Sequence, residues 1–188
     1  MANNKLSITS MISLIAAAIL LVVSIFFPWW RMDFFAPQYP EGLDIIVYPY
    51  TLAGDIEIVN GLNHYIGMEL FSNESFPELA FMPYIVAGFA LLTLIVAVWR
   101  NKKALYGLIT LFVIGGIVGI WDMYRWLREF GTNLDPAAPI DMEPFVPPII
   151  GENTIANFVT YSYFSVGAYL LLAVFILMVF PLWKDRGK

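Results

Sequence analysis

Residues 83–121 read PYIVAGFALLTLIVAVWRNKKALYGLITLFVIGGIVGIW, two apolar runs on either side of a short basic connection at 100–103. Each run is about 17 residues long, close to the length that a helix needs to cross the hydrocarbon core of a bilayer. A connection this short can join only antiparallel neighbouring helices. The segment therefore predicts a helical hairpin inside a membrane.

The composition of the whole chain agrees with an integral membrane protein. Of the 188 residues, 60% are hydrophobic and only 13% are charged, and the mean hydropathy is +0.72, unlike a typical soluble domain. Two further apolar runs begin near Ile8 and Tyr161. We expect an all-α fold in which residues 1–188 form a single membrane domain with four transmembrane helices, at about 8–28, 82–99, 104–122 and 160–183.

The basic residues predict the orientation of these helices. Seven lie on the side of the termini, and three lie on the other side. The seven are Lys5, Arg100, Lys102, Lys103, Lys184, Arg186 and Lys188, and the three are Arg31, Arg125 and Arg128. Because basic residues are in excess on the cytoplasmic side, both termini are expected in the cytoplasm.

The two outer loops, at about 29–81 and 123–159, are long and rich in proline and aromatic residues. Loops of this length usually carry structure or function of their own, so we expect them to fold together as a cap. In the first loop, the β-favouring runs 43–48 and 55–59 flank a turn signal at 53–55 and predict a small β-hairpin.

The second outer loop is expected to begin by extending the third helix as far as Gly131. Asp122 and Arg125 have the i,i+3 spacing of a helix-surface pair, and Arg125 and Glu129 have the i,i+4 spacing. We interpret Asp122 and Arg125 as a structural clasp at the membrane edge. The proline-rich stretch 135–148 predicts an extended strap over the outer surface, because proline cannot continue a helix or a central strand.

The residue inventory argues against several function classes. The chain has no cysteine, which removes disulfides and thiolate chemistry, and its net charge of −5 argues against nucleic acid as a partner. No predicted span has a charged residue at its centre, which weakens channel and transporter interpretations. No nucleophile motif surrounds the only histidine, so we expect no enzymatic activity.

The only histidine, His64, and Met68 are the first candidates for a metal site. If the chain is helical from Leu62, these two side chains lie one turn apart on one face, where imidazole and thioether could bind a soft metal such as Cu(I). Met142 could add sulfur, and Glu143 could add oxygen. The alternative is that His64 hydrogen-bonds to a carboxylate or carbonyl group and that Met68 packs in a turn.

Gly115 and Gly119 in the third span form a Gly-x-x-x-Gly pattern with Gly116 beside them. Such a pattern lets a second helix approach closely. Packing within the bundle is the first interpretation, and a homo-oligomer through Gly115 and Gly119 is the second.

Four outer stretches carry a resemblance to a known family. They are APQYPEGL at 36–43, NGLNHYIGM at 60–68, PELAFMP at 77–83 and NLDP at 133–136. They resemble small four-span bacterial membrane proteins encoded among the accessory genes for nitrous oxide reductase, a copper enzyme of denitrification matured outside the cytoplasm. The resemblance runs over most of the chain and implies a location in the cytoplasmic membrane, with the cap in the periplasm.

The resemblance points to His64 and Met68 as a metal-facing pair, and it adds Asp135 as a possible further ligand. The chain departs from the family where Thr132 replaces a histidine and where a Gly-Met segment is missing near Met142. We therefore expect a non-enzymatic accessory protein that handles or delivers copper, with a periplasmic copper chaperone or copper enzyme as partner. A metal-free docking subunit is the first alternative, and a quinone- or lipid-binding membrane subunit is the second.

Overall fold

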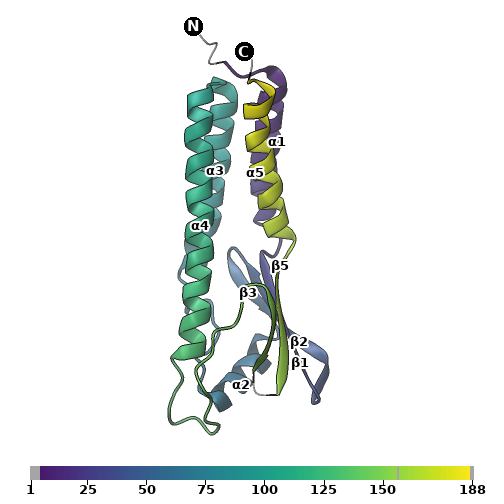
Figure 1. Ribbon diagram of the computed structural model, residues 1–188, viewed down its shortest axis with the longest axis vertical. Coiled ribbons are helices and arrows are strands. Elements are labelled where there is room, and N and C mark those ends of the chain that lie inside the picture. The colour runs from purple at the N-terminus through teal and green to yellow at the C-terminus, as the bar shows by residue number, and fades with distance from the viewer. Residues whose placement is uncertain (1–4, 156, 187–188) are drawn as a thin grey trace.

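The computed structural model describes residues 5–155 and 157–186, which form a helical half and a sheet half joined end to end (Figure 1). The first helix begins and the last helix ends at the end of the helical half that is far from the sheet (Figure 1). Lys188, one of the seven basic residues on the terminal side, lies outside the described residues.

The helical half contains α1 (Ile8–Ser24), α3 (Glu78–Trp99), α4 (Lys102–Thr132) and α5 (Val166–Lys184). Among the described residues, α3, α4 and α5 are long and apolar enough to cross a membrane, whereas α1 is a shorter apolar helix of 17 residues. This supports a membrane protein. The 31 residues of α4 span about 46 Å and exceed a hydrocarbon core of about 30 Å.

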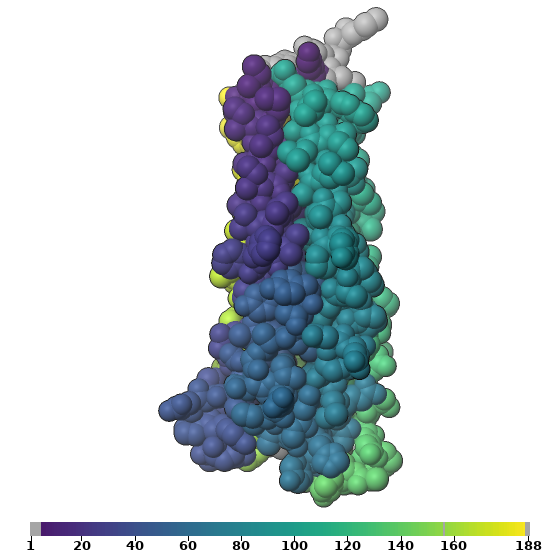
Figure 2. Space-filling model, turned by 180° about the vertical axis from the view of Figure 1, so that it is seen from behind, coloured from purple at the N-terminus to yellow at the C-terminus, as the bar shows by residue number. Residues whose placement is uncertain are grey.

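Helix α1 forms the packed centre of the helical half, between α3 and α5. Leu14, Ala17 and Leu21 of α1 are buried against a core that includes Ala90 of α3 and Val174 of α5. Figure 2, which views the molecule from behind, shows α1 and α3 in contact along the helical half. This side of the molecule is closed.

The sheet half contains a five-stranded antiparallel sheet, with strand order β3-β2-β1-β5-β4. The strands are β1 (Trp30–Ala36), β2 (Tyr39–Tyr48), β3 (Thr51–Gly54), β4 (Gly151–Ile155) and β5 (Phe158–Phe164). The prediction of an all-α fold with one small hairpin is therefore wrong. The sheet joins the two outer loops, because β1 from the start of the first loop pairs with β5 at the end of the second.

Two boundaries of the predicted spans change as a result. Residues 160–164, assigned to the last span, belong to β5, and α5 begins only at Val166. The run FVTYSYF is apolar and aromatic, so hydropathy alone could not separate this strand from the helix that follows. The first span ends at Ser24 instead of residue 28.

The predicted hairpin is only partly correct. Residues 43–48 lie in β2, but its partner is β3, and residues 56–59 begin α2 (Ile56–Ile66). The apolar residues Ile56, Val59 and Ile66 recur at helical spacing, and Gly67 ends the helix in a left-handed conformation with φ of 76°. Helical periodicity therefore outweighs the β propensity of this short run.

Two predictions for the second outer loop are confirmed. Helix α4 continues beyond Asp122 to Thr132, and residues 135–148 contain no helix or strand. This strap is held against the first loop by backbone hydrogen bonds from Asp135 N to Gly67 O (2.9 Å) and from Ile140 N to Tyr65 O (2.9 Å). The two outer loops therefore fold together, as expected.

Candidate functional site: an apolar cavity between the helices and the sheet

A cavity of about 990 Å³ lies where the helical half meets the sheet half. Its wall is almost entirely apolar. It is bounded by α3, α4 and α5 on the helical side and by β1, β2, β5 and α2 on the other side. The volume is at the upper end of the range for sites that bind small molecules, about 300 to 1,000 Å³.

The cavity exists because α4 stands away from the rest of the bundle. Only 11% of the residues in the most apolar segment of α4 are buried, compared with 28% for α3 and 22% for α5. Gly116 and Gly119 line the cavity, and a Cβ atom at either position would meet nothing within 4 Å. Gly115 has Phe89 of α3 as its neighbour, at 3.6 Å from the position of a Cβ atom.

The sequence pattern predicted that these glycines pack against a second helix of the bundle. Gly115 contacts Phe89 of α3, but Gly116 and Gly119 contact no second helix. Their missing side chains instead widen the cavity. A homo-oligomer through Gly115 and Gly119 stays a prediction.

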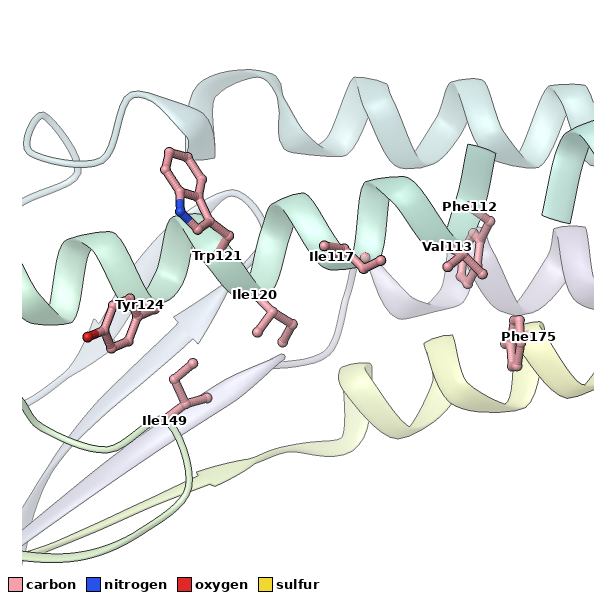
Figure 3. Close-up of a pocket in the computed structure, with 9 residues that line it drawn as sticks. Phe112, Val113, Ile117, Ile120, Trp121, Tyr124, Ile149 and Phe175 are labelled. Atoms are coloured by element: carbon pink, nitrogen blue, oxygen red, sulfur yellow. The ribbon is translucent and has the colours of Figure 1, made fainter. Parts of the chain in front are cut away.

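A second apolar pocket, open to the outer surface of the helical half, lies along α4, and we call it the lateral opening (Figure 3). It runs along α4 and is closed on the other side by Phe175 of α5 and Ile149 of the strap region (Figure 3). Its remaining lining residues on α4 are Phe112, Val113, Gly116, Ile117, Ile120, Trp121 and Tyr124. Phe112, Gly116, Ile120 and Phe175 line both the opening and the cavity, so the two spaces share a wall.

The sheet supplies the opposite wall through the alternation of its side chains. Trp30, Met32 and Phe34 of β1 are buried and line the cavity. Arg31 and Asp33, between them, point to the other face of the sheet, since successive side chains of a strand alternate. The cavity is therefore built from the same apolar side chains that form the core of the sheet half.

An aromatic cluster closes the far end of the cavity. Phe130 near the end of α4 stacks on Phe71 and Phe76, with ring centroids 4.8 and 5.4 Å apart, and Trp126 lies 6.0 Å from Phe130. All four residues line the cavity. Stacked rings of this kind give a rigid apolar floor.

A carboxylate cluster, formed by Glu78, Asp122 and Glu129 around Arg125, lies beside the cavity. The Arg125 guanidinium contacts Asp122 at 2.8 Å, Glu78 at 3.0 Å and Glu129 at 3.5 Å. The predicted pairs of Arg125 with Asp122 and Glu129 are thus present. Glu78 was missed, because it lies 47 residues from Arg125 in the sequence.

A second charged group lies on the opposite face of the sheet. Arg31 contacts Asp33 at 2.6 Å and Asp44 at 2.8 Å, and the Tyr163 hydroxyl donates to Asp33 at 2.8 Å. The hydrogen bond to Asp33 raises the pKa of Arg31, and burial together with the same carboxylate raises the pKa of Tyr163. Arg31 therefore pairs with two carboxylates, and these groups form a closed network of ion pairs and hydrogen bonds on the outer face of the sheet.

The predicted copper ligands do not lie on one helix face. Helix α2 ends at Ile66, so the chain turns at Gly67 before Met68. His64 is exposed, whereas Met68 is buried and lines the cavity. The helical spacing expected for this pair therefore ends before Met68, and the two residues as metal ligands stay a prediction.

The other predicted ligands lie in the strap. Asp135 is exposed, and its carboxylate accepts a hydrogen bond from the backbone of Ala137 at 2.8 Å. Met142 is half-buried, and Glu143 is exposed. Among residues 5–155 and 157–186, no group of three or more His, Cys, Asp or Glu side chains is arranged to hold a metal ion.

Comparisons with known proteins found no match to a protein-family model, to a curated protein or to a solved structure.

Proposed function

We propose that this protein binds a lipid-like molecule, which enters the cavity sideways from the bilayer through the lateral opening along α4. The observation that carries the proposal is one continuous apolar cavity that borders membrane-length helices on one side and the sheet on the other. An apolar wall of this kind favours an apolar ligand, because burying apolar surface is favourable and few polar groups would need partners.

The source of the ligand follows from the position of the opening. The lining residues of α4 from Phe112 to Trp121 lie in its apolar part, between Lys103 and the next charged residue, Asp122. A molecule that passes between α4 and Phe175 therefore comes from the hydrocarbon layer and needs no passage through water. The lipid-binding subunit was the second alternative from the sequence, because clefts between helices leave no sequence motif.

The proposed setting is the cytoplasmic membrane, with both termini in the cytoplasm and the sheet half outside. The basic residues of the α3–α4 connection and of the end of α5 lie at the terminal end of the bundle, where Lys102 donates to the backbone oxygen of Asp185 at 2.8 Å. An excess of basic residues marks the cytoplasmic side. In this orientation, the cavity lies at the outer leaflet.

Copper handling and metal-free docking stay predictions of the sequence. No distance or contact among the described residues favours either of them over lipid binding, so we do not propose them here.

Filling the cavity tests the proposal. Gly119→Leu and Gly116→Leu add a side chain where the wall has open space, so they should exclude the ligand and leave the fold intact. Gly107→Leu is the matched control: it lies on the same helix, a Cβ atom there also meets nothing within 4 Å, and it does not line the cavity.

The measurement is the lipid that remains with the purified protein after exchange into a defined detergent, quantified by mass spectrometry against protein concentration. We expect about one retained lipid per protein for the wild type and for Gly107→Leu, and a loss of about tenfold for Gly119→Leu. Equal retention by all of the variants, or none by the wild type, would contradict the proposal.

A further inference from the structure

We infer that the ligand has an uncharged head group with a hydroxyl donor, not a phosphate, and that Glu78 accepts the hydrogen bond from that hydroxyl. This inference rests on the proposed function and specifies the chemical class of the lipid. A prenyl alcohol and a quinol share this chemistry.

The first observation is an unused acceptor in the wall of the cavity. Glu78 Oε1 accepts from Arg125 at 3.0 Å and from the Trp126 indole at 3.3 Å. Glu78 Oε2 is buried and has no hydrogen-bond partner among the described residues. A buried carboxylate oxygen without a donor is costly. A ligand that supplies an O–H group gains a hydrogen bond to this acceptor when the Glu78 carboxylate turns toward the cavity, because Oε2 is covered by its neighbours in the structure.

The second observation is the sign of the charge beside the cavity. Glu78, Asp122 and Glu129 surround the single guanidinium of Arg125, and Glu78 and Asp122 line the cavity. Three carboxylates and one arginine leave an excess of negative charge when all are ionised. This charge would repel a phosphate at short range.

The third observation is the position of this cluster along α4. Phe112, at the inner end of the lining, lies ten residues before Asp122, about 15 Å along the helix. This inner part is apolar and bordered by Gly116 and Gly119. A tail can therefore lie at the level of the bilayer, while the head group reaches Glu78 near the boundary of the membrane.

The indole of Trp126 donates to Glu78, and the ring of Phe76 lies against this indole, with the two ring centroids 5.1 Å apart. They restrict the space around the carboxylate to flat, apolar surfaces. A small hydroxyl on a planar or unbranched group fits such a site better than a bulky hydrated phosphate ester, which would need several donors.

The test compares two ligands that differ only in the phosphate: a long-chain prenol and its monophosphate. Each competes with a fluorescent lipid for the full-length protein in nanodiscs. We expect the prenol to bind about tenfold more tightly or better, because it fills the free acceptor and avoids the carboxylates. A quinol and its quinone, as a second pair, test the need for the donor, since only the quinol has O–H groups. The relative affinities of the prenol and the quinol then distinguish the two sources of the hydroxyl.

Glu78→Gln should bring the ratio between prenol and prenyl phosphate toward one, because it removes the charge and one acceptor oxygen. Glu129→Gln is the matched control: it removes the same charge from the same cluster, but Glu129 does not line the cavity. This control should keep most of the discrimination.

Two results would overturn the inference, and they differ from each other. If the prenyl phosphate binds as tightly as the prenol, the head-group assignment fails, and the lipid-binding function stands. If neither competes and the purified wild type retains no lipid, the proposed function fails as well.

Discussion

The two sides of the helical half have similar composition and opposite packing. On one side, α1 buries Leu14, Ala17 and Leu21 against α3 and α5. On the other side, Gly116 and Gly119 of α4 border empty space. Apolar side chains of α1 therefore fill the space between helices, whereas the missing side chains of Gly116 and Gly119 leave the facing surface of α4 open.

This difference argues that the cavity is part of the working structure. Protein interiors are normally packed to the density of organic crystals, and voids cost stability because their lining loses contacts. The tightly packed α1 side shows that this chain can reach the packing density that is normal for protein interiors. A large apolar space on the other side is consistent with a ligand that completes the packing when it is bound.

The largest effect is expected from truncating matched aliphatic side chains on the two sides. Leu14→Ala removes a fully buried side chain from the α1 core and should lower the free energy of unfolding by about 2 to 3 kcal/mol. This is the lower part of the usual range, because lipid, not water, solvates separated helices. Ile120→Ala, at the cavity, should cost less than about 1 kcal/mol.

The free energy of unfolding of both variants is measured by reversible denaturation in mixed micelles, with circular dichroism as the probe of unfolding. Equal losses for Leu14→Ala and Ile120→Ala would mean that the α4 side is packed as tightly as the α1 side in the folded protein. The difference in packing between the two sides, on which the proposed function depends, would then be contradicted.

A second pair applies one chemical change, Gly→Ala, to both sides. Gly167 at the start of α5 is buried, and its new Cβ atom would overlap Trp29 and lie 2.8 Å from the backbone oxygen of Phe27. We expect a loss of about 2 kcal/mol, as for other overpacked sites. Gly116→Ala meets open space and should be neutral or stabilising by up to about 1 kcal/mol, because alanine is the better helix former.

Thermal unfolding of the two alanine variants in the same detergent measures this difference. If Gly167→Ala unfolds at the same temperature as the wild type, the backbone at the β5–α5 junction can shift to make room for the new Cβ atom. A marked loss for Gly116→Ala would show that the space beside α4 is occupied in the apo protein.

Local sequence patterns predicted the features that depend on near neighbours in the chain. The long apolar runs gave α3 and α4, and helical spacing gave the pairs of Arg125 with Asp122 and Glu129. The helix stop near Gly131 was correct within one residue. Each of these features is decided within a few turns of one helix.

The features that were missed depend on contacts between distant residues. Strand β1 pairs Trp30 with Phe164, and no local pattern indicates which of two apolar aromatic runs will pair. The same holds for Glu78, which joins Arg125 across two helices. The cavity leaves almost no signal in the sequence, because it forms where side chains do not contact one another. The glycines at 115–119 were the one indication, and their spacing was interpreted as a helix-packing pattern.

The smallest expected effect extends the comparison to the two faces of the sheet. One face lines the cavity, and the other is occupied by the ion pairs of Arg31 with Asp33 and Asp44. Tyr163→Phe removes the hydrogen bond to Asp33 and should cost about 1 kcal/mol or less at neutral pH. Tyr161→Phe, on the same strand, is the control, since the Tyr161 hydroxyl has no hydrogen bond within the described ranges.

The pH dependence of this effect has a definite sign. Burial and the bond to Asp33 raise the pKa of Tyr163 in the folded protein above its ordinary value of about 10. The contribution of Tyr163 to stability is therefore complete below about pH 10 and is lost as the pH rises through the folded pKa. The stability gap between the wild type and Tyr163→Phe should stay constant up to about pH 10 and then narrow, as measured by denaturant unfolding at each pH. A gap that widens with pH would place the Tyr163 hydroxyl away from Asp33, and the outer face of the sheet would then lack the closed network that distinguishes it from the cavity wall.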